Sequence, residues 1–254
     1  MALRWILALA ARTTALPTIA TISSRASTPA SNHCGAPDSS VIVSGTPWIV
    51  YSMNYNYQDI DGTCCTGFAG LVTGADGEQK CAWNSTWDIA EVDSTSNVPK
   101  GYSFVGLTQN LENTISDIAS IPATYNWIRS NETAYKGNVC FDFMTSDTKG
   151  DSTSSSAQEL MLWLRYEGGQ LPIGWADGAG VNTDTGIIVS SLLVDQGDQY
   201  YGYFAGDIKD WLSAMVKQGL FTSSTYVNVG NAGMEPFYGT VSFKNELGFK
   251  INLA

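Results

Sequence analysis

Short runs of β-forming residues, separated by turn residues, fill most of this chain and constrain its fold more than any other feature. Stretches rich in Val, Ile, Tyr, Phe and Trp alternate with Gly, Ser, Thr and Asn, and the chain contains 25 glycines. This pattern is typical of strands joined by turns. We predict strands at 46–55, 81–89, 102–107, 123–129, 138–145, 159–165, 186–194, 199–205, 225–230, 237–243 and 248–253.

Strands in this number, without helices between them, predict an all-β sandwich of two antiparallel sheets. The 254 residues, 44% of them hydrophobic, suffice for the core of one such domain. The Gly- and Cys-rich residues 61–70 are expected to form a turn. A single helix is predicted between Asp207, as N-cap, and Gly219, because apolar residues recur there at helical spacing.

The first 26 residues resemble a secretory leader. Arg4 precedes the apolar run 5–11, which is too short to span a bilayer. We expect residues 1–26 to be removed, leaving a domain of residues 27–254 that is secreted to the extracellular space. An N-terminus without a targeting role is the alternative. The sequons at Asn84 and Asn131 are compatible with secretion.

The charge of the chain restricts its partners. Its 13 basic and 24 acidic residues give a net charge of −11. Removing residues 1–26 takes away three arginines and no acid, so the balance becomes 10 − 24 = −14. Such a surface repels phosphate backbones and anionic lipids. We therefore expect neither a nucleic acid nor a membrane as partner, and a monomer by default.

The chain contains one histidine, His33. A Ser-His-Asp triad, a Cys-His nucleophile or a multi-histidine metal site would each depend on this residue alone. We find no Gly-rich phosphate loop followed by Lys. Neither a metal nor an organic cofactor is expected, and the carboxylates remain as the chemically active groups.

One carboxylate lies within an otherwise apolar strand, AQELMLWLRY at residues 157–166. Because side chains in a strand alternate between two faces, the leucines at 160, 162 and 164 share one face. The opposite face then carries Glu159, Met161, Trp163 and Arg165. Glu159 faces a substrate cleft in one interpretation; in the other it is an ion-pair partner of Arg165 or a solvated charge.

The same alternation applies to CFDFMTS at residues 140–146. Phe141 and Phe143 are expected in the core, with Asp142 on the opposite face. A third acid, Glu235, precedes Pro236, which favours an extended backbone. Two carboxylates on one concave face can act as nucleophile and as general acid/base, the pair that cleaves glycosidic bonds.

These segments together resemble glycoside hydrolase family 12, whose members are secreted endo-β-1,4-glucanases and xyloglucanases with a β-jelly-roll fold. E-L-M-L-W at 159–163 matches the motif of the nucleophile, and G-M-E-P-F-Y-G at 233–239 matches that of the acid/base. The strand that carries Asp142 matches the aspartate beside the nucleophile. The resemblance implies a retaining mechanism, with carboxyl groups ~5 to 5.5 Å apart. We expect Glu235 to have a raised pKa, Glu159 to stay ionised and Asp142 to share a proton with it.

The resemblance also implies residues that bind a β-1,4-linked glucan and one disulfide. The expected cleft residues are Tyr55, Met161, Trp163, Trp127, Trp175 and Pro172. Cys34 is expected to pair with Cys65. Cys64 with Cys81 is one option for a second bridge, which leaves Cys140 free.

Three departures from the family pattern concern substrate binding. Where the family has N-N-L-W, this chain has S-M-N-Y at 52–55, so the stacking tryptophan becomes Tyr55. Gln158 and Met234 replace a tyrosine and a small threonine beside the two glutamates. The predicted activity is hydrolysis of cellulose and mixed-linkage β-glucan. The alternatives are preference for xyloglucan and a non-catalytic glucan-binding paralogue.

Overall fold

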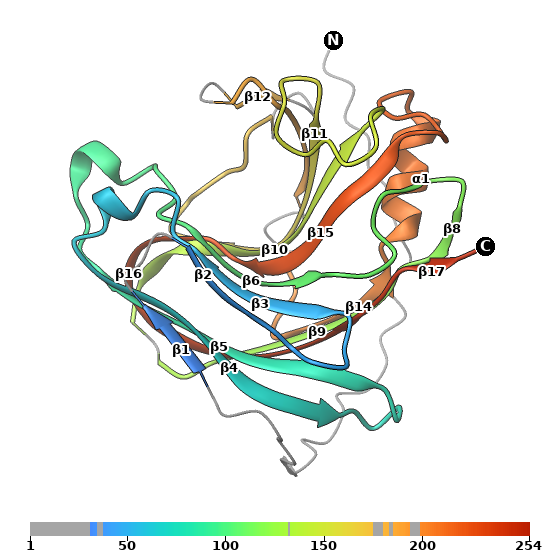
Figure 1. The fold of residues 1–254 in the computed structure, drawn as a ribbon. Helices are drawn as coiled ribbons and strands as arrows, with labels where there is room; N and C mark the ends of the chain where they lie inside the picture. Colours follow the sequence, from blue (N-terminus) through green and yellow to red (C-terminus); the bar gives the residue numbers. More distant parts are fainter. Residues whose placement is uncertain (1–30, 35–37, 132, 175–179, 183–184, 194–198) are drawn as a thin grey trace.

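The computed structural model describes residues 31–34, 38–131, 133–174, 180–182, 185–193 and 199–254, so the predicted leader lies outside the described residues. Its strands form two layers that pack face to face (Figure 1). The back layer has the order β1 (Ser31–Cys34), β4 (Gly62–Thr73), β5 (Gln79–Ile89), β16 (Pro236–Phe249), β9 (Pro122–Arg129) and β14 (Tyr203–Asp207).

The front layer has the order β2 (Asp38–Ile42), β3 (Trp48–Met53), β6 (Tyr102–Leu107), β15 (Tyr226–Met234), β10 (Tyr135–Ser146), β11 (Gln158–Glu167), β13 (Ile188–Leu193) and β12 (Gly180–Val181). The short β7 (Asn113–Thr114) pairs with β15. Two further strands, β8 (Ile118–Ser120) and β17 (Asn252–Leu253), pair only with each other. Short 3₁₀ turns follow β3 and β5 at Tyr57–Asp59 and Asp93–Thr95.

The predicted all-β jelly roll with one helix is confirmed, with two additions. The layers are not separate sheets, because three residues at the start of β10 pair with the start of β16 and make the hydrogen-bonded path continuous. In addition, β11 and β13 are parallel. A parallel pair needs a long crossover connection, and the chain between Glu167 and Ile188 provides one.

The core lies between the layers and follows from strand alternation. Phe141, Phe143 and the leucines at 160, 162 and 164 of the front layer are all buried in it, as the sequence predicts. Bulky aromatic side chains of the back layer, among them Trp83 and Trp87, cover them from the other side. Burial of this kind stabilises the fold by roughly 1.5–3 kcal/mol per large side chain.

The turn predicted at residues 61–70 is wrong, because residues 62–70 are a strand. They form most of β4, which pairs with β1 on one side and β5 on the other. The glycines that suggested a turn serve close packing instead. A Cβ at Gly62, where φ is +136°, would lie 1.9 Å from the Asp88 carbonyl oxygen. Only glycine tolerates that backbone conformation and that approach.

The predicted helix is α1 (Lys209–Lys217), which lies beside β8 and buries Leu212 and Met215. Asp207 precedes the helix, and its Oδ1 accepts a hydrogen bond from the backbone N–H of Lys209 at 2.9 Å. The chain leaves the helix at Gly219, where φ is +74°. Both flanking residues therefore act as helix-end signals, although Ile208 occupies the N-cap position. No helix among the described residues has the length and apolarity needed to cross a membrane.

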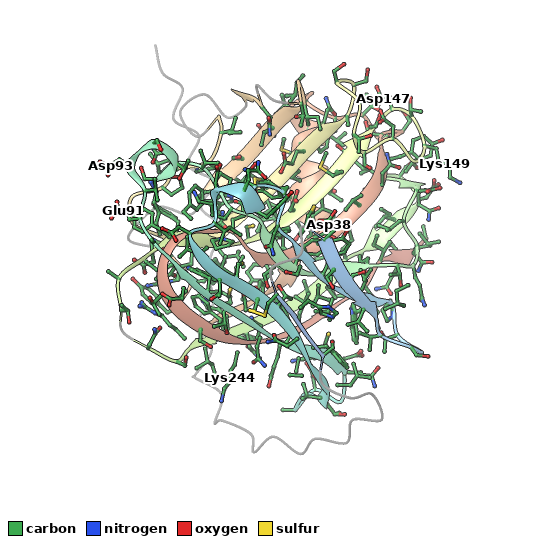
Figure 2. The ribbon with its side chains drawn as sticks, turned by 60° about the vertical axis from the view of Figure 1, so that its left-hand side comes forward. Asp38, Glu91, Asp93, Asp147, Lys149 and Lys244 are labelled. Carbon is green, nitrogen blue, oxygen red and sulfur yellow. A yellow bond between two sulfur atoms is a disulfide. The ribbon has the colours of Figure 1, made fainter. Side chains whose placement is uncertain are left out.

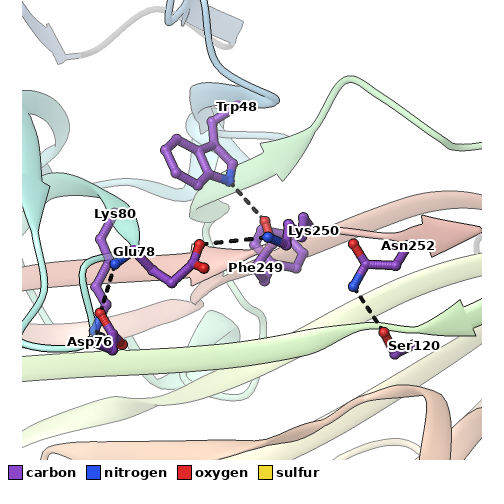
Figure 3. A network of polar contacts seen from close by, with 8 residues as sticks. All are labelled: Trp48, Asp76, Glu78, Lys80, Ser120, Phe249, Lys250 and Asn252. Atoms are coloured by element: carbon purple, nitrogen blue, oxygen red, sulfur yellow. Dashed lines mark hydrogen bonds and ion pairs between the residues drawn. The ribbon is translucent and has the colours of Figure 1, made fainter.

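Polar contacts close the end of the sandwich where β16 leads into β17. The indole N–H of Trp48 donates to the Phe249 carbonyl oxygen at 3.1 Å and so ties β3 to β16 (Figure 3). Nearby are the ion pairs Lys250–Glu78 and Lys80–Asp76, and the hydrogen bond from Asn252 to Ser120. Other charged side chains, such as Asp38, Glu91, Asp147 and Lys244, are exposed on the surface (Figure 2).

Candidate active site

Three carboxyl groups that are far apart in the sequence meet on the front layer, on the face opposite the core. We call this surface the site face; its other members are Tyr102, Phe104, Cys140, Met161, Trp163, Tyr166 and Val189. In the β10–β11 ladder Asp142 lies opposite Met161, and Glu159 lies opposite Met144. Asp142 and Glu159 are therefore diagonal neighbours, and their side chains share a hydrogen bond.

Glu235 reaches the same place from the other side of β10. It is the single residue between β15 and β16, and Gly233 of β15 lies opposite Cys140 of β10. The charge of Glu235 raises the pKa of both Asp142 and Glu159, which shows that the three groups are electrostatically coupled. The structure thus brings together the three acids that the sequence singles out.

Asn138 of β10 holds Glu235 through both its backbone and its side chain. Its Nδ2 donates to Glu235 Oε2 at 2.5 Å, and its Oδ1 accepts from the Glu235 backbone N–H at 3.1 Å. The Asn138 N–H also donates to the Glu235 carbonyl oxygen at 3.2 Å. Asn138 is buried and was not among the residues predicted from the sequence, although it precedes Cys140 and Asp142 at the two-residue spacing of one strand face.

The second oxygen of Glu235 accepts a hydrogen bond from a residue that the sequence assigns to substrate binding. The Tyr55 hydroxyl donates to Glu235 Oε1 at 3.0 Å. Tyr55 is 42% exposed, so its ring also presents surface to solvent. Its hydroxyl has a pKa well above the ordinary value because of burial of the oxygen and the nearby Glu235 charge, so it acts as a donor.

The three carboxyl groups have raised pKa values, primarily because burial disfavours their charged forms. The pKa of Asp142 lies well above its ordinary value, through burial and then the charges of Glu159 and Glu235. Burial and the Glu235 charge raise the pKa of Glu159 to about 7. Burial raises the pKa of Glu235, while hydrogen bonds from Asn138 and Tyr55 lower it.

A hydrogen bond between two carboxyl groups requires a proton, since an ionised carboxylate only accepts. The hydrogen bond raises the pKa of Asp142 and lowers the pKa of Glu159, so Asp142 is the group that keeps the proton. It then donates to Glu159, and this hydrogen bond lowers the pKa of Glu159. Glu159 was expected to stay ionised, but with a pKa of about 7 it becomes protonated below pH 7 while Glu235 is charged. When Glu235 is protonated, its charge no longer raises the pKa of Glu159, and that pKa is lower.

The residues predicted to line the cleft do not all lie on the site face. Met161 and Trp163 belong to the site face but are 8% and 2% exposed, and the Trp163 ring packs on Tyr166 at 6.4 Å. Pro172 is also buried, one residue after Leu171, which packs against the same cluster. Trp175 lies outside the described residues.

Trp127 does not line the site. It lies on β9 of the back layer, belongs to the core between the layers, and packs edge-on against Tyr125 at 5.1 Å. Strand alternation explains this correction, because Ala123, Tyr125 and Trp127 share the buried face of β9. A tryptophan in an otherwise apolar alternation belongs to the core more often than to a cleft.

A row of aromatic residues on β3 and β6 extends the site face and is absent from the predicted site. Tyr51 stacks on Phe104 with ring centroids 5.1 Å apart, and Phe104 stacks on Tyr102 at 4.8 Å. Tyr51 is half-buried. The signal that could have identified Tyr51 is its position two residues before Met53 in the predicted strand, because Tyr51 and Met53 share one face of β3 and both pack against the site-face cluster.

Arg165 does not share the face of Glu159. The β10–β11 ladder has a bulge between Val139 and Cys140, so that Cys140 lies opposite Trp163 while Val139 lies opposite Arg165. Leu164 is the extra residue of the bulge and stays in the core, and the alternation is reversed from Arg165 onward. Arg165 forms an ion pair with Glu167 and lies over the Tyr201 ring at 4.4 Å, which removes the interpretation of Glu159 as its partner.

The cysteines form one disulfide. Cys34 and Cys65 are bonded and tie β1 to β4, as the resemblance implies. Cys64, Cys81 and Cys140 are free and buried. The optional Cys64–Cys81 bridge is excluded by the register of β4 and β5, in which Cys64 lies opposite Trp87 while Cys81 lies opposite Leu71. In the described part of the chain, no three His, Cys, Asp or Glu side chains gather in a metal-binding arrangement.

A curled β-sandwich that carries two glutamates and an aspartate on one face has the architecture of a glycoside hydrolase. The family model of "Glycosyl hydrolase family 12" matches residues 46–252. The chain therefore belongs to glycoside hydrolase family 12.

Relatives and solved structures agree with this assignment. The chain is 30% identical over 239 residues to xyloglucan-specific endo-β-1,4-glucanase A of Emericella nidulans, covering 89% of this chain and 90% of that protein. It is 29% identical over 206 residues to endoglucanase A of Aspergillus kawachii, covering 74% and 81%. Another relative, 28% identical over 206 residues and covering 76% and 81%, is the inactive glycoside hydrolase XLP1 of Phytophthora nicotianae.

The fold is similar to that of Trichoderma harzianum endoglucanase 3, with a TM-score of 0.74 at 21% identity over 90% of this chain and 100% of that chain. The catalytic domain of Humicola grisea Cel12A gives a TM-score of 0.69 at 23% identity, covering 84% and 95%. At these identities the likeness supports the fold.

Proposed function

We propose that this protein is a secreted, retaining endo-β-1,4-glucanase that hydrolyses internal bonds of plant cell-wall glucans. The observation that supports the proposal most is the convergence of Glu159, Asp142 and Glu235 on one face. Asp142 keeps a proton and donates to Glu159, which is the arrangement that a carboxylate nucleophile needs. The names of the relatives, endoglucanase and xyloglucan-specific endoglucanase, agree with this chemistry.

In the first step, a Glu159 oxygen attacks the anomeric carbon of the sugar. The bond between that carbon and the glycosidic oxygen breaks, and the leaving oxygen takes the proton of Glu235. The products are a glycosyl ester on Glu159, an ionised Glu235 and a shortened glucan with a new hydroxyl group. Asn138 fixes the orientation of Glu235 for this transfer through its hydrogen bonds to the backbone and carboxyl of that residue.

In the second step, Glu235 acts as the base. It takes a proton from a water molecule, whose oxygen attacks the anomeric carbon and breaks the ester bond to Glu159. Glu159 is released as a carboxylate, and Glu235 is again protonated. Two displacements at the same carbon retain its configuration.

The glucan is proposed to lie along the site face. Sugar rings present apolar C–H surfaces that pack against aromatic rings. Tyr55 offers a partly exposed ring beside Glu235, and Tyr51 offers another beside Phe104, further along the site face. Met161, Trp163 and Pro172 would then support this surface from below. An exposed Asn84 on β5 is compatible with glycosylation and secretion.

Two competing functions come from the relatives. The xyloglucan-specific endo-β-1,4-glucanase A of Emericella nidulans, which is 30% identical over 239 residues, favours a preference for xyloglucan. A non-catalytic glucan-binding role is favoured by the relative named inactive. The three proposed catalytic acids argue against the second alternative, because a binding protein has no need of a nucleophile paired with an acid.

The test is a reducing-sugar assay of the purified protein on carboxymethyl cellulose, mixed-linkage β-glucan and xyloglucan. Glu159→Gln removes the nucleophile, and Glu91→Gln, at an exposed position, is the matched control. We expect release by the wild type and the control but not by Glu159→Gln. Equal release by all three proteins would refute the mechanism, and no release by any of them would favour the binding role. Proton NMR of the first product distinguishes retention from inversion.

A further inference from the structure

Substrate binding alone does not explain one contact of Tyr55, the hydrogen bond from its hydroxyl to Glu235. A side chain that only stacks on sugars needs its ring, yet the Tyr55 hydroxyl lies 3.0 Å from Glu235 Oε1. The other carboxyl oxygen accepts from Asn138. Both oxygens of Glu235 therefore accept a hydrogen bond from the protein before any substrate is bound.

The loop that carries Tyr55 is tied to the same segment as Glu235. The next residue, Asn56, donates from its side chain to the Pro99 carbonyl oxygen at 2.8 Å and from its backbone to that of Lys100 at 3.3 Å. Lys100 in turn donates its backbone N–H to the carbonyl oxygen of Pro236 at 2.8 Å, directly after Glu235. Lys100 is buried. This bridge fixes the loop against the Glu235–Pro236 turn, so the Tyr55 contact is built into the fold.

The surroundings of Glu235 oppose its ionised form. Asp142 and Cys140 face it from β10, and Glu159 faces it from β11, so its titratable neighbours there are acids or a thiol. Among the described residues, no Lys or Arg forms an ion pair with it. The hydrogen bonds from Tyr55 and Asn138 are therefore the contacts that favour a charged Glu235.

We propose that Tyr55 is a positioning residue for the acid/base, and that its hydroxyl orients Glu235 and stabilises its ionised form. This inference rests on the proposed function and deepens it. It states that the hydrogen bond from the Tyr55 hydroxyl shifts the upper pH limit of activity, which follows the ionisation of Glu235. The acid form of Glu235 is needed in the first step, and it is lost as pH rises through the pKa of Glu235. A hydrogen bond that favours the ionised form moves this limit to lower pH. Removing the hydroxyl moves it to higher pH.

The experiment compares the wild type with Tyr55→Phe, which keeps the ring and removes the hydroxyl. Tyr57→Phe is the matched control, since Tyr57 lies in the adjoining 3₁₀ turn, is also exposed, and has no contact with the three acids in the described structure. The measurement is kcat/KM against pH on the preferred soluble glucan. We expect the alkaline limb of Tyr55→Phe to lie at higher pH than those of the wild type and Tyr57→Phe. KM should change little, because the ring remains.

An alkaline limb that stays in place, or moves to lower pH, would overturn the proposal. A uniform loss of activity at all pH values would indicate a role in packing only, and overturns it equally. A matching thermal midpoint for Tyr55→Phe and the wild type shows that both are folded.

A second measurement does not need turnover. Carbon-13 NMR of glutamate-labelled protein follows the ionisation of Glu235 directly, with Glu235→Gln identifying its signal. We expect this titration to lie at higher pH in Tyr55→Phe than in the wild type. If the wild type cleaves no glucan but the NMR shift is found, the proposed function fails, while the part of the inference that concerns the ionisation of Glu235 stands. If glucan is cleaved and neither the limb nor the signal shifts, the inference alone fails.

Discussion

The two faces of strands β10 and β11 share one backbone but carry side chains of different character. On the core face, Phe141, Phe143 and Leu162 are buried among other apolar side chains. On the site face, at the alternate positions of the same strands, Asp142 and Glu159 are held close together with raised pKa values. The same two strands therefore stabilise the fold with one set of side chains and place reactive groups with the other.

This difference shows how the site face depends on the core face. Holding carboxyl groups in a poorly solvated place costs free energy, and the raised pKa values express that cost. The core face offsets it with apolar burial and keeps the strands in register. Substitutions on the two faces should therefore separate activity from stability.

The largest effect is expected from Glu235→Ala on the site face. Loss of the general acid/base should lower kcat by roughly 10²–10⁴-fold. Added azide should restore part of the rate, because it attacks the glycosyl ester without needing a base. The measurement is turnover of an activated aryl glucoside with and without azide. Full activity in the variant would contradict the assignment of Glu235.

The second effect is expected from Leu162→Ala on the core face. It should lower the free energy of unfolding by about 2–5 kcal/mol, because it leaves a cavity between the layers. The kcat of the folded fraction should stay unchanged. Urea denaturation measures the loss, and Leu253→Ala, at an exposed position on β17, is the control. A loss of kcat without a loss of stability would mean that the two faces are not separable.

The pH dependence of stability should come from the site face. The pKa of Glu159 is about 7 in the folded protein against 4.5 as its ordinary value. The folded state therefore binds the proton more tightly, and stability should fall as pH rises from about 4.5 to about 7. Asp142 acts in the same direction. Asp76 and Asp151, outside the site face, have lowered pKa values, so their opposite contributions change only at more acidic pH.

Urea midpoints between pH 4.5 and pH 7.5 check this prediction, with Glu159→Gln as the comparison. The variant should lose less stability over this interval than the wild type, because one of the coupled groups no longer ionises. Parallel curves for the two proteins would show that Glu159 titrates normally in the fold.

The smallest effect is expected from Met161→Leu. Met161 lies on the site face opposite Asp142, and leucine has a similar volume. We expect a change in the free energy of unfolding below about 1.5 kcal/mol, measured by the same urea denaturation. A loss as large as that of Leu162→Ala would mean that the site face also carries core-like packing energy.

Much of this organisation could be predicted from the sequence. Strand alternation alone placed the three leucines and two phenylalanines in the core and turned Asp142 and Glu159 the other way. The Pro that follows Glu235 and the family motif both pointed to that acid, and the resemblance added the Cys34–Cys65 disulfide. These predictions succeeded because they depend on local periodicity or on motifs of contiguous residues.

The predictions that depended on strand pairing, or on whether a side chain lies in the core or in the cleft, were wrong in three places. Arg165 changed face because of a bulge in the ladder, and a bulge leaves no mark in the residue pattern. Trp127 was expected in the cleft but lies in the core, since a tryptophan suits either place. The turn expected at residues 61–70 is a strand, because pairing on both sides overrides the preference of glycine for turns.

By itself, then, the amino-acid sequence determined the class of fold, the two faces of each strand and the identity of the three acids. Only the tertiary structure decided which side chains hold those acids and how strongly they attract protons. The hydrogen bonds from Tyr55 and Asn138 to Glu235 join residues 180 and 97 positions apart. Such contacts arise only when strands pair and layers pack, because a pKa depends on the neighbours in space and not on the neighbours along the chain.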